Sequence, residues 1–393
     1  MDAYQAIVIG GGIGGLSAAL ALHRRGILVT VHERAASLEP VGAGLALAPN
    51  ALRALDRLGI GERLRALAVP HPAIGVRHPS GRWLARTDTA TFEACFGETI
   101  TAVARADVIA ALVDALPDGT VRTDSPAALV TPGSATEPAV VWTPDGDRPA
   151  TLVVAADGLR SATRAQLFPQ HPGPRYSGFT TWRTIVSPTR RPDAVGEVWG
   201  RGELAGVVPL ADDRVYVYGA ALAPAGARAA DGDEKAELLR RFGTWCAPVP
   251  QLLALAEPGR VLRHDVWDLA DPLPAYHHGR VALLGDAAHA MCPFQGQGAC
   301  QAIEDAVVLA SALTPAADPA TTLPAYTAAR LPRTTAIVTG SRRIGDLVAL
   351  RTPAATRLRD AALTFAGLLP ARTLLNRSAR TYNWQPPALD ATA

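Results

Sequence analysis

The chain has 393 residues, of which 48% are hydrophobic and 19% charged, with a formal net charge of +2 at pH 7. This length is sufficient for two hydrophobic cores, and scattered arginines with a small net charge give no nucleic-acid-binding signature. The four cysteines have no metal-ligand spacing, so we expect a cytoplasmic protein with reduced thiols and no structural metal.

Residues 6–33 read as a strand, a tight turn, a helix and a second strand. Although residues 5–22 are mostly apolar, glycines interrupt them and no basic segment precedes them, which argues against a signal peptide or a membrane span. Gly10, Gly12 and Gly15 form the GxGxxG pattern of a dinucleotide site, with Glu33 ending the second strand. The phosphates would lie at the helix N-terminus, and Glu33 would accept from a ribose hydroxyl.

A helix is expected over residues 50–68, a small β excursion over about 71–97 and another helix over 105–116. Two β-like runs follow, and the second ends just before Asp157. Between about 175 and 270 the pattern is mostly strand, with runs at 180–186, 195–200, 204–210 and 214–221 and a helical insert at about 233–256. The βα pattern resumes at 280–313, and terminal helices are expected at 325–348 and 355–383. Beyond about residue 345 the helices could form part of the core, a lid or a dimer contact, of which we expect core packing.

These elements predict an α/β fold with a discontinuous Rossmann-type dinucleotide domain, an antiparallel β-sheet substrate domain and C-terminal helices. We place the first domain at residues 1–70, 98–174 and 276–345. The substrate domain takes residues 71–97 and 175–275, and the C-terminal helices take 346–393.

A second glycine-bearing segment selects FAD over NAD. Gly285 and Asp286 follow the apolar run 281–284, where a short carboxylate can bond a polyol such as the ribityl chain. Farther on, Gly296, Gln297 and Gly298 open a helix whose N-terminus can donate to the pyrimidine edge of a flavin. The neighbouring carboxylates Glu304 and Asp305 read as surface residues. His289 is predicted to have a structural role, and His277 to lie at the surface or at the end of a strand.

Together with the turn that begins at Asp157 and Gly158, these segments resemble the class A, single-component FAD-dependent aromatic monooxygenases, typified by para-hydroxybenzoate and salicylate hydroxylases. The similarity extends to about residue 340. It implies that the Asp157 turn, with Arg160, Ser161 and Arg164, serves both FAD and a passing nicotinamide, and that Arg105 approaches the flavin side of FAD. Residues 42–44 resemble the family pattern near the isoalloxazine ring. Phe294 and Cys300 depart from the family pattern, in which both positions often carry Asn. The substrate class of the family therefore cannot be assigned to this chain.

The predicted cofactor-binding residues are those that match the family motifs or flank them: Gly10, Gly12, Ile13, Gly14, Gly15, Glu33, Arg34, Ala43, Gly44, Arg105, Asp157, Asp286, Pro293, Gly296, Gln297, Gly298 and Ala299. The predicted substrate pocket comprises residues of the central strands and of the loop after Asp286: Trp182, Tyr216, Tyr218, Pro293, Phe294 and Gln295. For Trp182, a position in the hydrophobic core and a position in the substrate pocket are predicted equally well. Arg183, Tyr216, Tyr218 and His264 are candidates for a catalytic base by location alone, and none is assigned. His264 also reads as a surface or strand-end residue.

The resemblance implies an NAD(P)H- and O₂-dependent enzyme with non-covalent FAD that hydroxylates or epoxidises a small, aromatic substrate through a flavin C4a-hydroperoxide. No second GxGxxG is present, so the nicotinamide would dock transiently. Two alternatives remain open at this point, an FAD-dependent reductase or dehydrogenase of the same fold and a non-catalytic flavin-binding protein. We expect a monomer or homodimer without nucleic-acid or membrane partners.

Overall fold

The computed structural model describes residues 4–38, 43–71, 73–192 and 195–389. The first layer of the fold is built on a six-stranded sheet with the strand order β17-β18-β11-β1-β2-β7. The strands are β1 (Gln5–Ile9), β2 (Leu28–His32), β7 (Val121–Arg122), β11 (Leu152–Ala155), β17 (His277–His278) and β18 (Val281–Leu283). Because β1 pairs in parallel with β2 and β11, and β11 with β18, the carboxyl ends of four distant segments meet at one edge.

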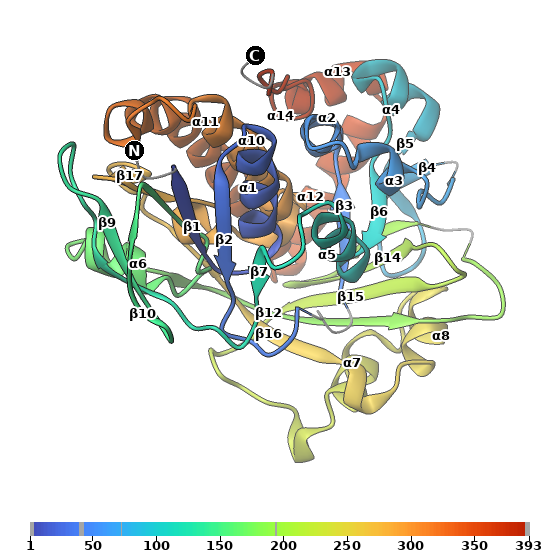
Figure 1. The fold of residues 1–393 in the computed structure, drawn as a ribbon. Coiled ribbons are helices and arrows are strands. Elements are labelled where there is room, and N and C mark those ends of the chain that lie inside the picture. The colour runs from blue at the N-terminus through green and yellow to red at the C-terminus, as the bar shows by residue number, and fades with distance from the viewer. Residues whose placement is uncertain (1–3, 39–42, 72, 193–194, 390–393) are drawn as a thin grey trace.

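Helices α1 (Ile13–Arg24) and α10 (Gly298–Ser311) lie against each other beside this sheet, as Figure 1 shows. Further helices on this side are α2 (Pro49–Arg57), α3 (Gly61–Arg65) and α5 (Arg105–Asp114). A smaller antiparallel sheet of β8 (Ala128–Thr131), β9 (Ala139–Thr143) and β10 (Gly146–Ala150) packs against β1 and β11. The sequence indicated only part of this small sheet. Helix α6 (Ala162–Leu167) follows β11, and α9 (Asp286–His289) follows β18.

A seven-stranded sheet forms the second layer, with the order β16-β12-β15-β14-β13-β4-β5. Its strands are β4 (Ala73–Arg77), β5 (Trp83–Asp88), β12 (Arg175–Val186), β13 (Gly196–Trp199), β14 (Glu203–Pro209), β15 (Val215–Leu222) and β16 (Leu262–Asp268). The four strands expected between 180 and 221 are confirmed. Neighbouring strands are antiparallel except for the parallel pair β13 and β4.

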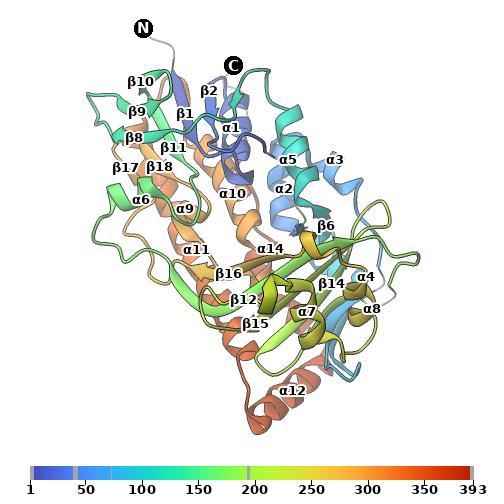
Figure 2. The same ribbon diagram turned by 90° about the horizontal axis from the view of Figure 1, so that it is seen from below.

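Alternation along β15 gives this sheet two different faces, because successive side chains of a strand point to opposite sides. Val215 and Val217 point to the outer face, which α7 (Glu234–Phe242) and α8 (Val249–Ala254) cover. Tyr216 and Tyr218 point to the opposite, inner face. Figures 1 and 2 show the sheet lying between these two helices and the six-stranded layer.

The expected β excursion at 71–97 is correct only as far as Asp88. After the hairpin of β4 and β5 the chain forms helix α4 (Thr89–Phe96), because the Asp88 carboxylate caps it by accepting from the Thr91 N–H at 2.7 Å. Another short antiparallel pair, β3 (Gly44–Leu47) and β6 (Thr101–Ala104), links the two layers.

The C-terminal part is helical: α11 (Pro319–Val348), α12 (Pro353–Gly367), α13 (Ala371–Leu375) and α14 (Ala379–Tyr382). The first of these begins earlier than expected, with Pro319 in its first turn and an Asp318 cap. Helix α12 packs on β5, whereas its Leu358 and Phe365, and Leu368 directly after it, remain exposed. Among the described residues, no helix combines the length and apolar character that a membrane span needs.

Candidate active site

The turn between β1 and α1 requires glycine at two positions. Gly10 has φ +107°, and a Cβ there would lie 2.4 Å from the Ala156 carbonyl oxygen. A Cβ on Gly15 would lie 1.9 Å from the Gly10 carbonyl oxygen, so α1 approaches the turn too closely for any side chain. Gly14 has a different role, since its Cβ would meet the Leu284 Cδ2 at 2.7 Å where α1 packs on the segment after β18.

The N-terminus of α1 opens onto space that fits a phosphate. Gly12 caps the helix without a side-chain hydrogen bond, so the first N–H groups, beginning with that of Ile13, have no side-chain acceptor. The nearest atom to a Cβ on Gly12 would be Nη2 of Arg105, at 4.0 Å. Within the described chain this guanidinium makes no hydrogen bond or ion pair, and burial lowers its pKa while Asp286 partly offsets that effect. An unpaired cation beside an uncapped helix N-terminus fits the FAD pyrophosphate.

Glu33 lies beside the same turn. Its carboxylate accepts from the Gly11 N–H at 2.7 Å and from the Ala35 N–H at 2.9 Å. It is half-buried at the end of β2, and the next residue, Arg34, is exposed. The position fits a ribose hydroxyl because each carboxylate oxygen retains acceptor capacity.

Asp286 is exposed in a segment whose other residues, 281–290, are buried. Gly285 before it has φ +61°, and its N–H donates to the Asp305 carboxylate at 2.9 Å. His289 closes the turn by bonding the same carboxylate through Nε2 at 2.6 Å, which confirms its structural reading. The turn thereby presents Asp286 on the side of Arg105, as a ribityl partner would require.

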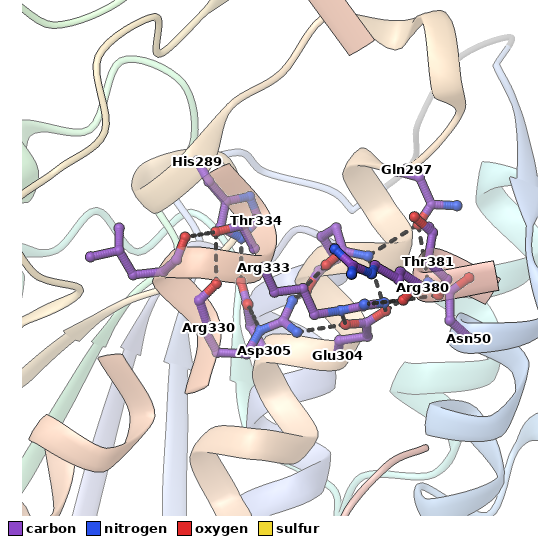
Figure 3. Close-up of polar contacts among 12 residues, drawn as sticks. Asn50, His289, Gln297, Glu304, Asp305, Arg330, Arg333, Thr334, Arg380 and Thr381 are labelled. Atoms are coloured by element: carbon purple, nitrogen blue, oxygen red, sulfur yellow. Dashed lines mark hydrogen bonds and ion pairs between the residues drawn. The ribbon is translucent and has the colours of Figure 1, made fainter. Parts of the chain in front are cut away.

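Glu304 and Asp305, read from the sequence as surface carboxylates, are instead fully buried, and that prediction was wrong. Arg330 of α11 bonds both, through Nη1 to Glu304 at 2.5 Å and through Nε to Asp305 at 2.6 Å. Arg333 and Asn50 also bond Glu304 (Figure 3). Against the effect of burial, Arg330 and Arg333 lower the pKa of Glu304, and His289 and Arg330 lower that of Asp305. Gln301, Glu304 and Asp305 form one polar face of α10 at i, i+3, i+4 spacing, which by itself is typical of a surface helix. Only the packing of α11, with Arg330, shows that this face is buried.

The N-terminus of α10 also lacks a side-chain cap. Gln297 is buried and its Oε1 accepts from Asn50 at 3.0 Å and from Gln301 at 3.0 Å, so its side chain belongs to the buried network. Gly298 and Ala299 are half-buried, whereas Pro293 and Gly296 are exposed. The backbone of this segment, rather than the Gln297 side chain, is therefore free to face a flavin.

Residues 43–44 lie between the two layers. The Arg105 N–H donates to the Ala43 carbonyl at 2.9 Å. A Cβ on Gly44 would lie 2.6 Å from the Tyr216 ring, so this ring packs directly on the segment. Gly42, the first residue of the expected turn, lies outside the described residues.

The Asp157 turn is stabilised by its own side chain. The carboxylate accepts from the Ser161 hydroxyl at 2.5 Å and from the Thr163 N–H at 3.1 Å. Arg164 donates to the carbonyls of Ala287 and Leu159, which ties this turn to the segment after Asp286. Arg160 is exposed and lines a surface groove of about 630 Å³ together with Arg228, Arg263 and His264.

The inner face of the seven-stranded sheet carries the candidate catalytic residues. Arg183 donates through Nη2 to His264 Nδ1 at 2.9 Å, and its Nε is buried without a partner. Burial and the charge of Arg183 lower the pKa of His264, which favours a neutral imidazole. Burial raises the pKa of Tyr216 to about 12, so its hydroxyl keeps its proton.

Trp182 does not belong to this face, which corrects the pocket assignment. It is 2% exposed, packs with the outer cluster around Phe242 and donates through Nε1 to Glu234 at 2.7 Å. Because successive side chains of a strand point to opposite faces, Trp182 and Arg183 lie on opposite sides of the sheet.

Phe294 and Gln295 lie between the inner face and α11. The Phe294 ring meets Phe179 edge-on, with centroids 5.0 Å apart, and lies over Gly345, whose Cβ would be 2.7 Å from it. Gln295 approaches Gly340 of the same helix, where a Cβ would lie 2.8 Å from its Nε2. Phe294 nevertheless remains half-buried, so its role as a pocket wall stays a prediction.

One functional candidate escaped sequence reasoning. Glu197 on β13 points to the inner face and accepts from the Tyr218 hydroxyl and from Trp199 Nε1, each at 2.7 Å. No pattern in the sequence singles it out, because its place on this face depends on the pairing of β12, β15, β14 and β13.

Comparison with known proteins agrees with this site. A family model described as "FAD binding domain" matches residues 3–341. The aurachin C monooxygenase/isomerase of Stigmatella aurantiaca is 38% identical over 344 residues, 87% of this chain and 88% of that protein. The FAD-dependent urate hydroxylase of Klebsiella pneumoniae subsp. pneumoniae is 32% identical over 349 residues, 87% of this chain and 90% of that protein.

The solved structure of Klebsiella pneumoniae HpxO with FAD and uric acid superposes with a TM-score of 0.88 at 29% identity, covering 98% of this chain and 97% of that one. These findings favour the oxygenase over the two alternatives left open by the sequence. The enzyme is an FAD-dependent monooxygenase, for which NAD(P)H and O₂ are the co-substrates expected of the family. The chain belongs to the FAD-binding-domain family of flavoprotein aromatic monooxygenases.

Proposed function

We propose that the enzyme inserts one oxygen atom into an aromatic or heteroaromatic substrate that binds between the inner face of the seven-stranded sheet and the loop at residues 291–296. One observation carries this proposal. Two segments distant in sequence, both expected beside the flavin, contact the same face: Gly44 lies against Tyr216, and Phe294 against Phe179. A planar substrate held there would face the flavin on one side and the sheet on the other.

FAD would be held by groups along its whole length. Arg105 and the N-terminus of α1 would bind the pyrophosphate, Glu33 the adenosine ribose, Asp286 the ribityl chain and the N-terminus of α10 the pyrimidine edge. Bound FAD supplies the redox chemistry and the activation of O₂. The residues of this chain orient the substrate, keep water out and hold protons at the substrate hydroxyl or ring nitrogen.

Arg183 and His264 are our candidates for proton control. Arg183 donates to His264 Nδ1 at 2.9 Å, which places the proton of the neutral imidazole on Nε2, so Nδ1 can accept a substrate proton only when Arg183 releases it. His264 lies at the exposed edge strand β16, so a proton it accepts can pass to solvent.

We further propose that the nicotinamide cofactor docks transiently in the groove beside the Asp157 turn. The exposed Arg160 and Arg228 line this groove and can bind phosphate groups. The side chain of Arg263 beside them is instead buried and lies against Glu234 and Asp265. Replacement of Arg160 or Arg228 with Ala should raise KM for NADPH or NADH several-fold and leave FAD affinity unchanged. Unchanged KM in both variants would count against this docking site.

We assign the two sheets with their helices to FAD-binding and substrate domains divided at the residues given above. The four free cysteines fit a reducing compartment, so we place the enzyme in the cytoplasm as a monomer or homodimer.

The proposed activity is tested with the purified, FAD-loaded protein and a panel of phenols and heteroaromatic compounds. NAD(P)H consumption, O₂ consumption and hydroxylated product are measured together. We expect a substrate that stimulates both consumptions and yields product. Product formation without O₂ uptake would assign the protein to reductase or dehydrogenase chemistry instead.

A further inference from the structure

A row of polar side chains crosses the inner face of the seven-stranded sheet. Arg183 on β12 lies opposite Tyr218 on β15, and Tyr218 lies opposite Gly206 on β14. Gly206 in turn lies opposite Glu197 on β13. Directly opposed residues of antiparallel strands share a face, so Arg183, Tyr218 and Glu197 all point toward the proposed substrate space.

Gly206 allows the members of this row to meet. A Cβ at Gly206 would lie 2.0 Å from Cζ of Tyr218, so the Tyr218 ring lies across the glycine. Its hydroxyl thereby reaches Glu197 Oε1 at 2.7 Å. Any side chain at position 206 would displace the ring and break this contact.

Both donors to Glu197 are fixed in place. Trp199 donates through Nε1 to Glu197 Oε2 at 2.7 Å, and the Arg359 guanidinium covers its ring at 5.7 Å. Burial and the nearby carboxyl hold the pKa of Tyr218 well above 10, so Tyr218 remains a donor. The carboxyl group is therefore rigidly oriented, with one donor on each oxygen and acceptor capacity left over.

Glu197 differs from the other deeply placed carboxylates in its charge environment. Glu304 and Asp305 each pair with Arg330, whereas no basic side chain of the described residues pairs with Glu197. Burial raises the pKa of Glu197, whereas the hydrogen bonds from Trp199 and Tyr218 act in the opposite direction and stabilise the carboxylate form. Glu197, Tyr218 and Phe294 are nevertheless only half-buried as residues, so this part of the face is not sealed by packing.

We propose that Glu197 is a specificity-determining residue that accepts a hydrogen bond from a ring N–H or hydroxyl of the substrate and repels a carboxylate at the same position. The preferred substrate is then a neutral aromatic or N-heteroaromatic compound with a donor on its ring, and benzoate-like anions are excluded. This inference rests on the proposed function, because it uses the same substrate space. A hydrogen bond to neutral donor-bearing rings, combined with repulsion of carboxylates, would give this selectivity.

The test compares Glu197→Gln with Glu234→Gln. Glu234 is a matched control, because it also accepts from a tryptophan Nε1 at 2.7 Å, but on the outer face of the same sheet. Ligands are the N–H, N-methyl and ring-carboxylate forms of hydroxylated indole, benzimidazole and 2-quinolone. Dissociation constants are measured on the FAD-loaded proteins from the change in flavin absorbance.

The parent and Glu234→Gln should bind the N–H form of at least one ring system about ten-fold or more tightly than its N-methyl form. Glu197→Gln should lose this preference and should bind the carboxylate form more tightly than the parent does, because an amide N–H can donate to it. A variant with a damaged fold would instead lose affinity for all three forms.

Equal binding of N–H and N-methyl forms by the parent, no binding of any form, or the same changes in both variants would overturn the assignment of Glu197. Coupled hydroxylation of a benzoate by the parent would also overturn it while leaving the proposed oxygenase function intact. Absence of O₂ uptake with every compound, despite preferential binding of an N–H form, would count against the function and not against Glu197.

Discussion

Glu33 and Asp286 are carboxylates at the two ends of the proposed FAD site, one beside the first glycine turn and one exposed after β18. Replacement of either by Ala should weaken FAD binding about ten- to a hundred-fold, because each removes a charge-assisted hydrogen bond of about 1.5–3 kcal/mol. Titration of the apoprotein with FAD, followed by flavin fluorescence, measures the effect. Asp145→Ala is the control, since this exposed carboxylate makes only surface ion pairs. Parent-like titration of both site variants would remove these residues from the FAD site.

Phe294 contacts Phe179 and Gly345, yet it remains half-exposed beside the proposed substrate space. Phe294→Ala should retain FAD and reduction by NAD(P)H but release more H₂O₂ per nicotinamide oxidised, because water gains access to the flavin. Peroxide and hydroxylated product are measured side by side. Phe365→Ala, on the exposed face of α12, is the control. A loss of thermal stability with unchanged coupling would show that Phe294 only packs between the layers.

At the level of elements, the buried ion-pair network joins α10 to α11 and fixes the turn that presents Asp286. Asp305→Asn should lower the free energy of unfolding by about 3–5 kcal/mol at pH 7, because Arg330 and His289 lose a buried charged partner. Urea unfolding measures the change. Glu93→Gln, an exposed helix carboxylate, should change it by less than about 0.5 kcal/mol.

The same network predicts a dependence on pH. The folded-state pKa of Asp305 is lowered, so its stabilising contribution is present above the unfolded pKa of about 4 and is lost as pH falls through the folded value. The difference in unfolding free energy between the parent and Asp305→Asn should therefore shrink as the pH is lowered below about 4. A difference that stays constant between pH 7 and pH 3 would contradict this account.

For the whole molecule, the C-terminal segment closes over the FAD layer. Arg53 of α2 donates to the carbonyls of Tyr382 and Trp384, and Arg333 donates to those of Arg380 and Thr381. The Trp384 ring covers Arg330 and Arg333 at 5.9 and 5.5 Å. The end of the chain therefore shields the network that supports the FAD site.

Trp384→Ala should destabilise the protein by about 1–3 kcal/mol, through loss of the cation–π contacts and of buried ring area. It should also lower the temperature at which FAD is released. Differential scanning fluorimetry on flavin emission measures both changes. Trp142→Ala, whose ring is 46% exposed on β9, is the control and should behave as the parent does.

The sequence by itself determined the FAD-binding fold, because the patterns that specify this fold lie within single turns and strands. The positions of Gly10 and Gly15 are dictated by backbone contacts within one βα turn, and the strands between 180 and 221 follow from alternation that a half-buried sheet requires. The Glu33 and Gly285 positions were found for the same reason, as both directly follow apolar strands.

Only the tertiary structure decided which face each side chain occupies and which charges are buried. Trp182 and Arg183 are neighbours in sequence, yet the face that α7 covers and the face that the FAD layer covers are chosen by packing between distant segments. Glu304 and Asp305 are buried because Arg330, which follows them by 26 and 25 residues, offsets the cost of removing them from water. Glu197 becomes a candidate site residue only because β12, β15, β14 and β13 align in one sheet, a register that long-range pairing sets.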